Sequence, residues 1–231
     1  PTLPVEPELA VFLMGLAPAL GGEVRLEGQW PTWPGTEAGL DLLRQTGAKV
    51  ECSATEILAR SLKPLAELPA AFALPEGLPA SWRPLAVALS TMTALRGGRA
   101  VLPAGLEAEE NVVESYLHAA GLALDAEGCL VAWKPGDDME EAEEQDEEGR
   151  PVRKPRPALQ ARGWNAPDAP WAVALAPAAC ARGKQEGFKL GNPGVLTELY
   201  PPFWVLYNNL PEPHMTRENK DCLLYTSDAA D

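Results

Sequence analysis

The sequence contains few residues of the kinds that bind metals or act as nucleophiles. Among its 231 residues there are only four cysteines, which lie far apart, and two histidines. They form no CxxC motif and no Cys/His ligand set, so neither a structural metal nor a Cys/His nucleophile is expected. A P-loop, a GxGxxG turn, an HExxH helix and a serine nucleophile elbow are also missing. We therefore expect no metal and no cofactor.

Positive charge is scarce as well. Lys and Arg number 19 against 33 Asp and Glu, which gives a formal net charge of −14. Nucleic acids and anionic membrane surfaces are bound through an excess of Lys and Arg, so neither is expected as a partner. The sequence has no signal peptide and no apolar run of transmembrane length, and a cytoplasmic location is the prediction.

Most of the net charge comes from one segment. Nine acidic residues lie between Asp137 and Glu148, and four basic residues follow at once: Arg150, Arg153, Lys154 and Arg156. Like charges at this density repel each other and have little apolar surface to bury. We predict a disordered, solvated insertion at 135–157, in which the basic residues fold back in part on the acidic ones. The alternative is a specific acidic docking segment.

Both ends of the sequence look like the cut ends of a longer chain rather than natural termini. The first residues, PTLPVEPELAVF, include no initiator Met, and the last, RENKDCLLYTSDAAD, lose the hydrophobic pattern and resemble translated adapter sequence. We interpret 211–231 as a tail of non-native appearance, and its last part, 217–231, takes no part in the fold prediction. The chain is interpreted as a fragment.

What the sequence does contain is one pattern that occurs three times, at about 5–60, 80–133 and 168–210. Each copy begins with an apolar helix that ends at glycine, as in EPELAVFLMGLAPAL before Gly21 and Gly22. A short strand, a second amphipathic helix and further strands follow, as in EVRLEG, TEAGLDLLRQTG and AKVEC. Such units cannot bury their apolar faces alone, so we expect an α/β fold of three βαβαββ-like repeats packed around a shared core.

Four segments carry a family resemblance through their order and spacing: LGGEVRLEG, LAVALSTMTALRGGRAVLPAG, VESYLHAAGLALDAEGCLVAW and DAPWAVALAPAACARG. Together they resemble the second domain of the enolpyruvyl transferases, above all the 5-enolpyruvylshikimate-3-phosphate synthase (3-phosphoshikimate 1-carboxyvinyltransferase) family, across a domain at 1–210. The resemblance implies a transferase of the shikimate pathway of aromatic amino acid biosynthesis. It also implies small phosphorylated substrates, phosphoenolpyruvate and shikimate 3-phosphate, which yield 5-enolpyruvylshikimate 3-phosphate and phosphate. The substrates would bind against an N-terminal domain of the same chain, which this fragment lacks.

The positions where that family is basic or polar differ in this sequence. The family's Lys-Glu-Ser/Thr-Asp-Arg stretch matches Gly105 to Glu109, and its Asp-His-Arg matches Asp168, Ala169 and Pro170. A lysine of the family matches Glu198, and an aspartate matches Ser81. An Arg–phosphate contact is a strong charge-assisted pair, whereas a carboxylate in its place repels the phosphate. The alternative interpretation is therefore a catalytically inactive scaffold or binding relative with a degenerate active site.

Two residues are left as candidate catalytic groups, Glu109 and Asp168, and the substrate-binding residues stay unassigned. Glu107, Glu109 and Glu110 lie in the first turn of a predicted helix, where the helix dipole favours acids; in the alternative, Glu109 is a general acid/base. Asp168 matches the family pattern and also stands where a helix N-cap is expected. The amino-sugar enolpyruvyl transferases and the RNA 3′-phosphate cyclases are a third possibility, although the missing basic patches disfavour the cyclases.

Overall fold

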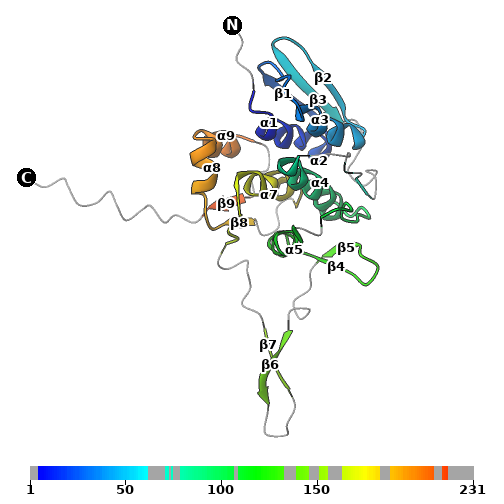
Figure 1. Cartoon of the computed structure of the whole chain (residues 1–231), viewed down its shortest axis with the longest axis vertical. Helices are drawn as coiled ribbons and strands as arrows, with labels where there is room; N and C mark the ends of the chain where they lie inside the picture. Colours follow the sequence, from blue (N-terminus) through cyan, green and yellow to red (C-terminus); the bar gives the residue numbers. More distant parts are fainter. Residues whose placement is uncertain are drawn as a thin grey trace, which may run out of the picture.

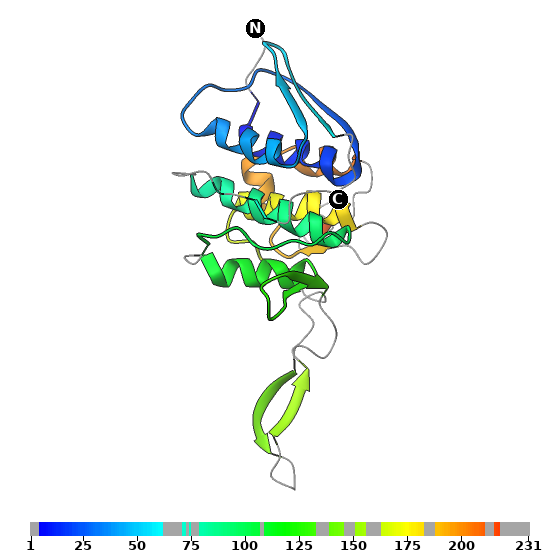
Figure 2. The same cartoon turned by 90° about the vertical axis from the view of Figure 1, so that its right-hand side faces the viewer.

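The computed structural model describes residues 5–61, 71–72, 74, 79–106, 109–132, 139–145, 151–155, 163–182, 188–210 and 215–217. In this part of the chain, helices stack in layers, and a three-stranded sheet covers one end of the stack (Figures 1 and 2). The α/β class that the sequence predicts is confirmed. No helix in the described ranges is both long and apolar enough to span a bilayer.

The first segment builds a sheet over helices. Its elements are α1 (Pro7–Met14), α2 (Leu16–Leu20), β1 (Gly22–Glu27), α3 (Thr36–Gln45), β2 (Lys49–Cys52) and β3 (Glu56–Ser61). The strands run antiparallel in the order β1-β3-β2. Along β3, Ile57 and Ala59 are buried while Arg60 between Ala59 and Ser61 is exposed. This alternation gives the sheet an apolar inner face and a charged outer face.

The second segment repeats the helix pair with a smaller sheet. It contains the 3₁₀ turn η2 (Ala80–Trp82), α4 (Arg83–Leu95), α5 (Glu110–Ala119), β4 (Leu122–Leu124) and β5 (Leu130–Ala132). β4 and β5 pair antiparallel, and Val101 makes an isolated bridge to Cys129 just before β5. Gly121 joins α5 to β4 with φ +69°, a left-handed conformation that only glycine adopts at little cost.

The third segment supplies the central helix. Its elements are α7 (Ala169–Arg182), β8 (Phe188–Leu190), α8 (Gly194–Leu199), α9 (Phe203–Asn208) and β9 (Met215–Arg217), with β8 and β9 parallel. α1, α2, α4 and α8 all pack against α7, which is buried along nearly its whole length. Its sequence, APWAVALAPAACAR, is rich in alanine, so neighbouring helices approach it closely from several sides.

Three elements differ from the sequence prediction, and a proline accounts for each difference. The first apolar helix is split at Gly15, because Pro18 has no N–H to donate to the Met14 carbonyl. The last helix is split into α8 and α9 by Pro201 and Pro202. RAVLPAG forms a bridge at Val101 rather than a strand, since a proline follows two residues later. The common three-repeat arrangement stays a prediction.

The insertion at 135–157 contains a hairpin where a disordered loop was predicted. β6 (Met139–Gln145) pairs antiparallel with β7 (Pro151–Pro155), and the disorder of the insertion as a whole stays a prediction. The register sets Glu140 opposite Lys154 and Glu141 opposite Arg153, so the basic strand lies along the acidic one, and opposite charges across strands are favourable. The rest of the insertion, and the predicted tail 211–231 apart from β9, lie outside the described residues.

Candidate functional site

The N-terminal ends of α3, α4 and α5 are joined by two contacts. The indole Nε1 of Trp82, just before α4, donates to the Gly35 carbonyl at the start of α3, at 2.9 Å. The Arg83 guanidinium, the first residue of α4, lies 2.9 Å from Glu109 Oε1 at the start of α5. Unpaired N–H groups and the helix dipole make helix N-termini favourable places for anions. We take this junction as the candidate site.

Glu109 supplies the anion at this junction itself. It occupies the N-cap position of α5, and its own N–H donates to the Leu106 carbonyl at 2.8 Å. The side chains of Arg83 and Glu109 are only 30% and 20% exposed. Partial burial strengthens their attraction, because less water screens the charges. The carboxylate therefore neutralises Arg83 beside the N-terminal end of α5, without a capping hydrogen bond to that helix.

The two carboxylate oxygens of Glu109 differ in their hydrogen bonding. Oε1 accepts the Arg83 hydrogen bond, whereas Oε2 is buried and has no hydrogen-bond partner among the described residues. A carboxylate oxygen that is withdrawn from water normally finds a donor. Glu109 is therefore held in place through half of its carboxylate, and the other half has spare accepting capacity.

Asp168 has a local structural role. Its Oδ1 accepts the Trp171 N–H at 3.0 Å, and its carbonyl accepts the Ala172 N–H at 3.1 Å. These two bonds are those of an N-cap residue, here of α7, and the side chain is exposed. No hydrogen bond or ion pair of the described residues joins Asp168 to Glu109. The structure thus does not bring the two candidate residues into direct contact.

The other positions singled out from the sequence do not form a cluster of polar groups. Gly105 is exposed with φ +88°, and Glu198 is exposed on α8. Ser81 is half-buried in η2, and Ala169 is buried at the first turn of α7. Glu107 lies outside the described residues. None of these positions contributes a cation to the junction of α3, α4 and α5.

Sequence reasoning missed Arg83, which the structure places at the centre of the junction. The signal was present: in SWRPLAV, Arg83 directly precedes Pro84 and is the first helical residue. A cation is disfavoured at a helix N-terminus, because it faces the positive end of the dipole. An arginine at this position therefore calls for a nearby carboxylate, which Glu109 supplies from 26 residues away in the sequence.

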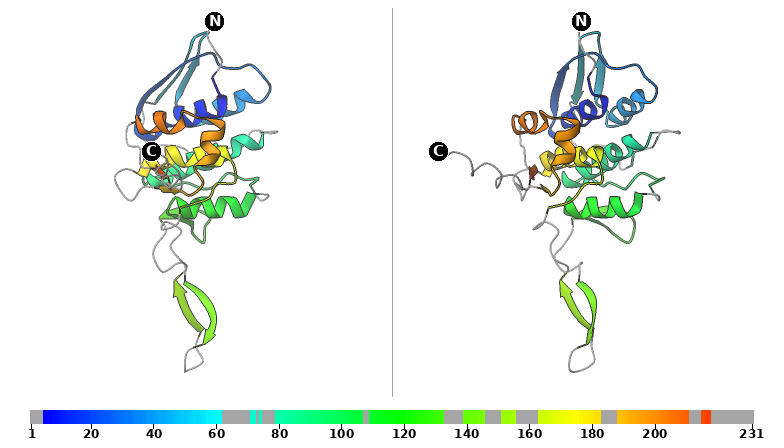
Figure 3. Two further views of the ribbon diagram at one scale, coloured as in Figure 1. Left: turned by 90° about the vertical axis from the view of Figure 1, so that its left-hand side faces the viewer. Right: turned by 60° about the vertical axis from the view of Figure 1, so that its left-hand side comes forward.

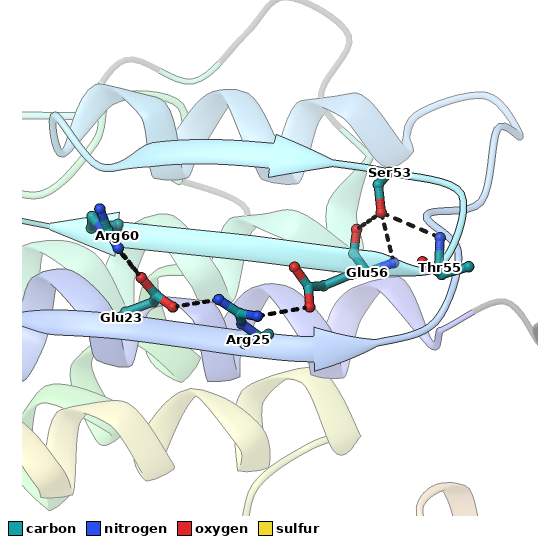
Figure 4. A network of polar contacts seen from close by, with 6 residues as sticks. All are labelled: Glu23, Arg25, Ser53, Thr55, Glu56 and Arg60. Atoms are coloured by element: carbon teal, nitrogen blue, oxygen red, sulfur yellow. Dashed lines mark hydrogen bonds and ion pairs between the residues drawn. The ribbon is translucent and has the colours of Figure 1, made fainter.

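Five other basic side chains of the described residues are engaged in ion pairs as well. The ion pairs join Arg25 to Glu23 and Glu56, Arg44 to Glu37 and Asp41, Lys49 to Glu51, Arg60 to Glu23, and Arg99 to Glu127. Figure 4 shows the network on the outer face of the first sheet, where Glu23 lies between Arg60 and Arg25. These two guanidinium groups lower the pKa of Glu23, Arg60 through the larger effect. Cations paired in this way are less available to a phosphate.

One concave feature of the described residues is apolar. A crevice between α1, α7 and α9 is lined by Phe12, Leu13, Leu16, Val173, Ala176, Pro177, Phe203 and Leu210. It offers no hydrogen-bonding side chain, so it does not suit a phosphorylated ligand.

Nearby, Tyr116 donates to the Ala174 carbonyl at 3.2 Å, and burial raises the pKa of its phenol. No set of three or more His, Cys, Asp and Glu side chains in the described ranges is arranged to hold a metal.

Comparison with known proteins gives distant structural similarity and no match in sequence. No protein-family model matches the chain, and no curated protein matches it in sequence. Among solved structures, EPSP synthase from Acinetobacter baumannii aligns with a TM-score of 0.45 at 11% identity, over 79% of this chain and 38% of that one. The chain therefore spans well under half the length of that enzyme. The family membership suggested by the sequence remains a hypothesis at this level of similarity.

Proposed function

We propose that this chain is an enolpyruvyl-transferase-like domain that keeps a scaffold of the family's second-domain type and has lost its phosphate contacts. The observation that carries the proposal is the Arg83–Glu109 ion pair. It occupies the junction of three helix N-termini, the place where an anionic substrate would be bound most favourably. In this chain the carboxylate of Glu109 already occupies that position.

A phosphorylated ligand at this junction would meet an occupied cation. To reach Arg83 it would have to displace Glu109, whose carboxylate would then stand close to the phosphate in a partly desolvated setting. Repulsion between like charges in such a setting costs several times more than it does in bulk water. The ion pairs of Arg25, Arg44, Lys49, Arg60 and Arg99 support the proposal in the same way, since these cations too are engaged with carboxylates of the chain.

The second candidate function is enolpyruvyl transfer itself, from phosphoenolpyruvate to shikimate 3-phosphate, in a cytoplasmic protein whose N-terminal domain supplies the phosphate contacts. One observation favours it: Glu109 Oε2 is buried without a hydrogen-bond partner among the described residues. A fixed carboxylate with one free oxygen has the geometry of a general acid/base, provided that a substrate lies within hydrogen-bonding distance. In this case Arg83 would hold the carboxylate in position.

The test is phosphate release from phosphoenolpyruvate and shikimate 3-phosphate by the longest protein that the reading frame encodes. The scaffold proposal expects no release above background from folded protein, in an assay where an authentic EPSP synthase is active. Turnover that is abolished by Glu109→Gln, and retained by the matched Glu110→Gln, would contradict the scaffold proposal and support the second candidate. Glu110 is a suitable control because it is the next residue and is exposed.

A further inference from the structure

The β1-β3-β2 sheet lies at one end of the molecule, beyond the helical layers (Figures 1, 2 and 3). Because β3 lies between the other two strands, β1 and β2 form the edges of the sheet. No strand or bridge of the described residues pairs with the outer edge of β2. Such an edge presents unpaired N–H and C=O groups, to which a strand of another chain can add. β2 contains no proline, so it has a backbone N–H at every position.

The two charges of β2 have no complementary charge directly opposite them on β3. Lys49 and Glu51 are exposed on the outer face and pair with each other along the strand. Lys49 lies directly opposite Arg60 of β3, which is another cation, and Glu51 lies opposite Leu58. Like charges directly opposite each other are unfavourable. An acid on the free side of Lys49, and a base on the free side of Glu51, would offset this arrangement.

A second copy of β2 supplies both of these charges. If two β2 strands pair antiparallel about a twofold axis at Val50, Glu51 of each copy lies opposite Lys49 of the other. Val50 is half-buried on the inner face, and it would meet its own copy there and bury more apolar surface. With the same face outward, the neighbouring registers place the axis at Lys49 or at Glu51 and set like charges opposite each other. The charges of β2 therefore select one register.

We propose that two copies of this chain associate through β2, antiparallel and about a twofold axis at Val50, so that their three-stranded sheets form one continuous sheet. The paired edge is only four residues long. Its interface therefore belongs to the small, transient class, and the dimer depends on concentration. The proposal is independent of the function proposed above, because it uses no residue of the junction of α3, α4 and α5.

Charge reversal tests the pairing, with sedimentation velocity of the full chain over a range of concentrations. We expect a reversible dimer that Lys49→Glu and Glu51→Lys each weaken by roughly threefold to thirtyfold, since either change sets like charges opposite each other twice. The double variant Lys49→Glu/Glu51→Lys should restore association, because both opposite-charge pairs form again with their signs exchanged. Arg99→Glu is the matched control for Lys49→Glu. It makes the same charge change at an exposed residue outside this sheet and should leave association unchanged.

Cysteine cross-linking tests the register. In a Cys52→Ser/Cys222→Ser background, in which Cys129 and Cys180 remain and are buried, Val50→Cys places two thiols on directly opposed residues. Their Cα atoms would be about 5 Å apart, which suits a disulfide. Cys52 lies two residues from the axis in each copy, so its two Cα atoms would be about 14 Å apart, which is too far. Mild oxidation should therefore link the Val50→Cys variant and should not link the Cys222→Ser chain through Cys52.

Three results would overturn the proposal. The wild-type chain could stay monomeric at the highest concentration tested, or the double charge variant could associate no better than the single variants. Linkage through Cys52 as fast as in the Val50→Cys variant would also overturn it, because the register would then be wrong. Circular dichroism of each variant shows whether it is folded, so that a loss of association in a folded variant is assigned to the edge of β2.

Discussion

Two groups of ion pairs in this molecule use the same chemistry in different surroundings. On the outer face of the β1-β3-β2 sheet, Arg25 is 58% and Arg60 53% exposed where they pair with Glu23 (Figure 4). At the junction of α3, α4 and α5, Arg83 and Glu109 are 30% and 20% exposed. Water and salt screen the first group, and they screen the second far less. The sheet pairs are therefore screened surface contacts, whereas we propose that the junction pair determines what the candidate site can bind.

The largest effect is expected from breaking the junction pair. Glu109→Ala leaves Arg83 partly buried without its carboxylate, at the positive end of α4. We expect a loss of about 1 to 2 kcal/mol in the free energy of unfolding, between the values typical of exposed and of buried pairs. Urea denaturation of the single variants Glu109→Ala and Arg83→Ala and of the double variant measures it. A coupling energy near zero in this cycle would place the pair with the surface pairs and remove the contrast.

A smaller effect is expected at the other candidate residue, Asp168. Asp168→Ala removes the hydrogen bond from the Trp171 N–H and with it the cap of α7. Loss of an N-cap costs about 1 kcal/mol. Asp168→Ser, which keeps a capping oxygen, should recover most of this loss in the same denaturation experiment. If the serine variant is as unstable as the alanine variant, Asp168 has a role other than capping.

The smallest effect at neutral pH is expected from Glu23→Gln on the sheet, and it should depend on pH. Arg60 and Arg25 lower the pKa of Glu23 below its ordinary value of 4.5, so the folded chain holds this carboxylate ionised more readily than the unfolded chain does. The stabilisation is fully present above the unfolded pKa and is lost as the pH falls through the lower folded value. The gap in melting temperature between wild type and Glu23→Gln should therefore close in acid, and it should shrink in high salt. A gap that widens as the pH falls would show that the sign is wrong.

Local pattern predicted much of the fold, and tertiary contacts decided the rest. α3, α5 and the β4–β5 pair follow from periodicity and from glycine positions such as Gly121, because each depends on neighbours in the sequence. The helix breaks at Pro18 and at Pro201 also follow from the local sequence, although the sequence prediction did not include them. The Arg83–Glu109 pair was not accessible, since it depends on how α4 and α5 lie beside each other. The β6–β7 register likewise depends on a balance of charge across strands that composition alone does not give.

In the proposed function, Glu109 occupies the position at which a phosphorylated ligand would bind. This proposal is tested most directly by titrating phosphoenolpyruvate into the full chain by isothermal calorimetry, for wild type, Glu109→Gln and the control Glu110→Gln. We expect no saturable binding to wild type or to Glu110→Gln at millimolar ligand, and detectable binding to Glu109→Gln, in which Arg83 and the helix N-termini are released. Saturable binding to wild type that is lost in Glu109→Gln would contradict it, because Glu109 would then be part of a working site.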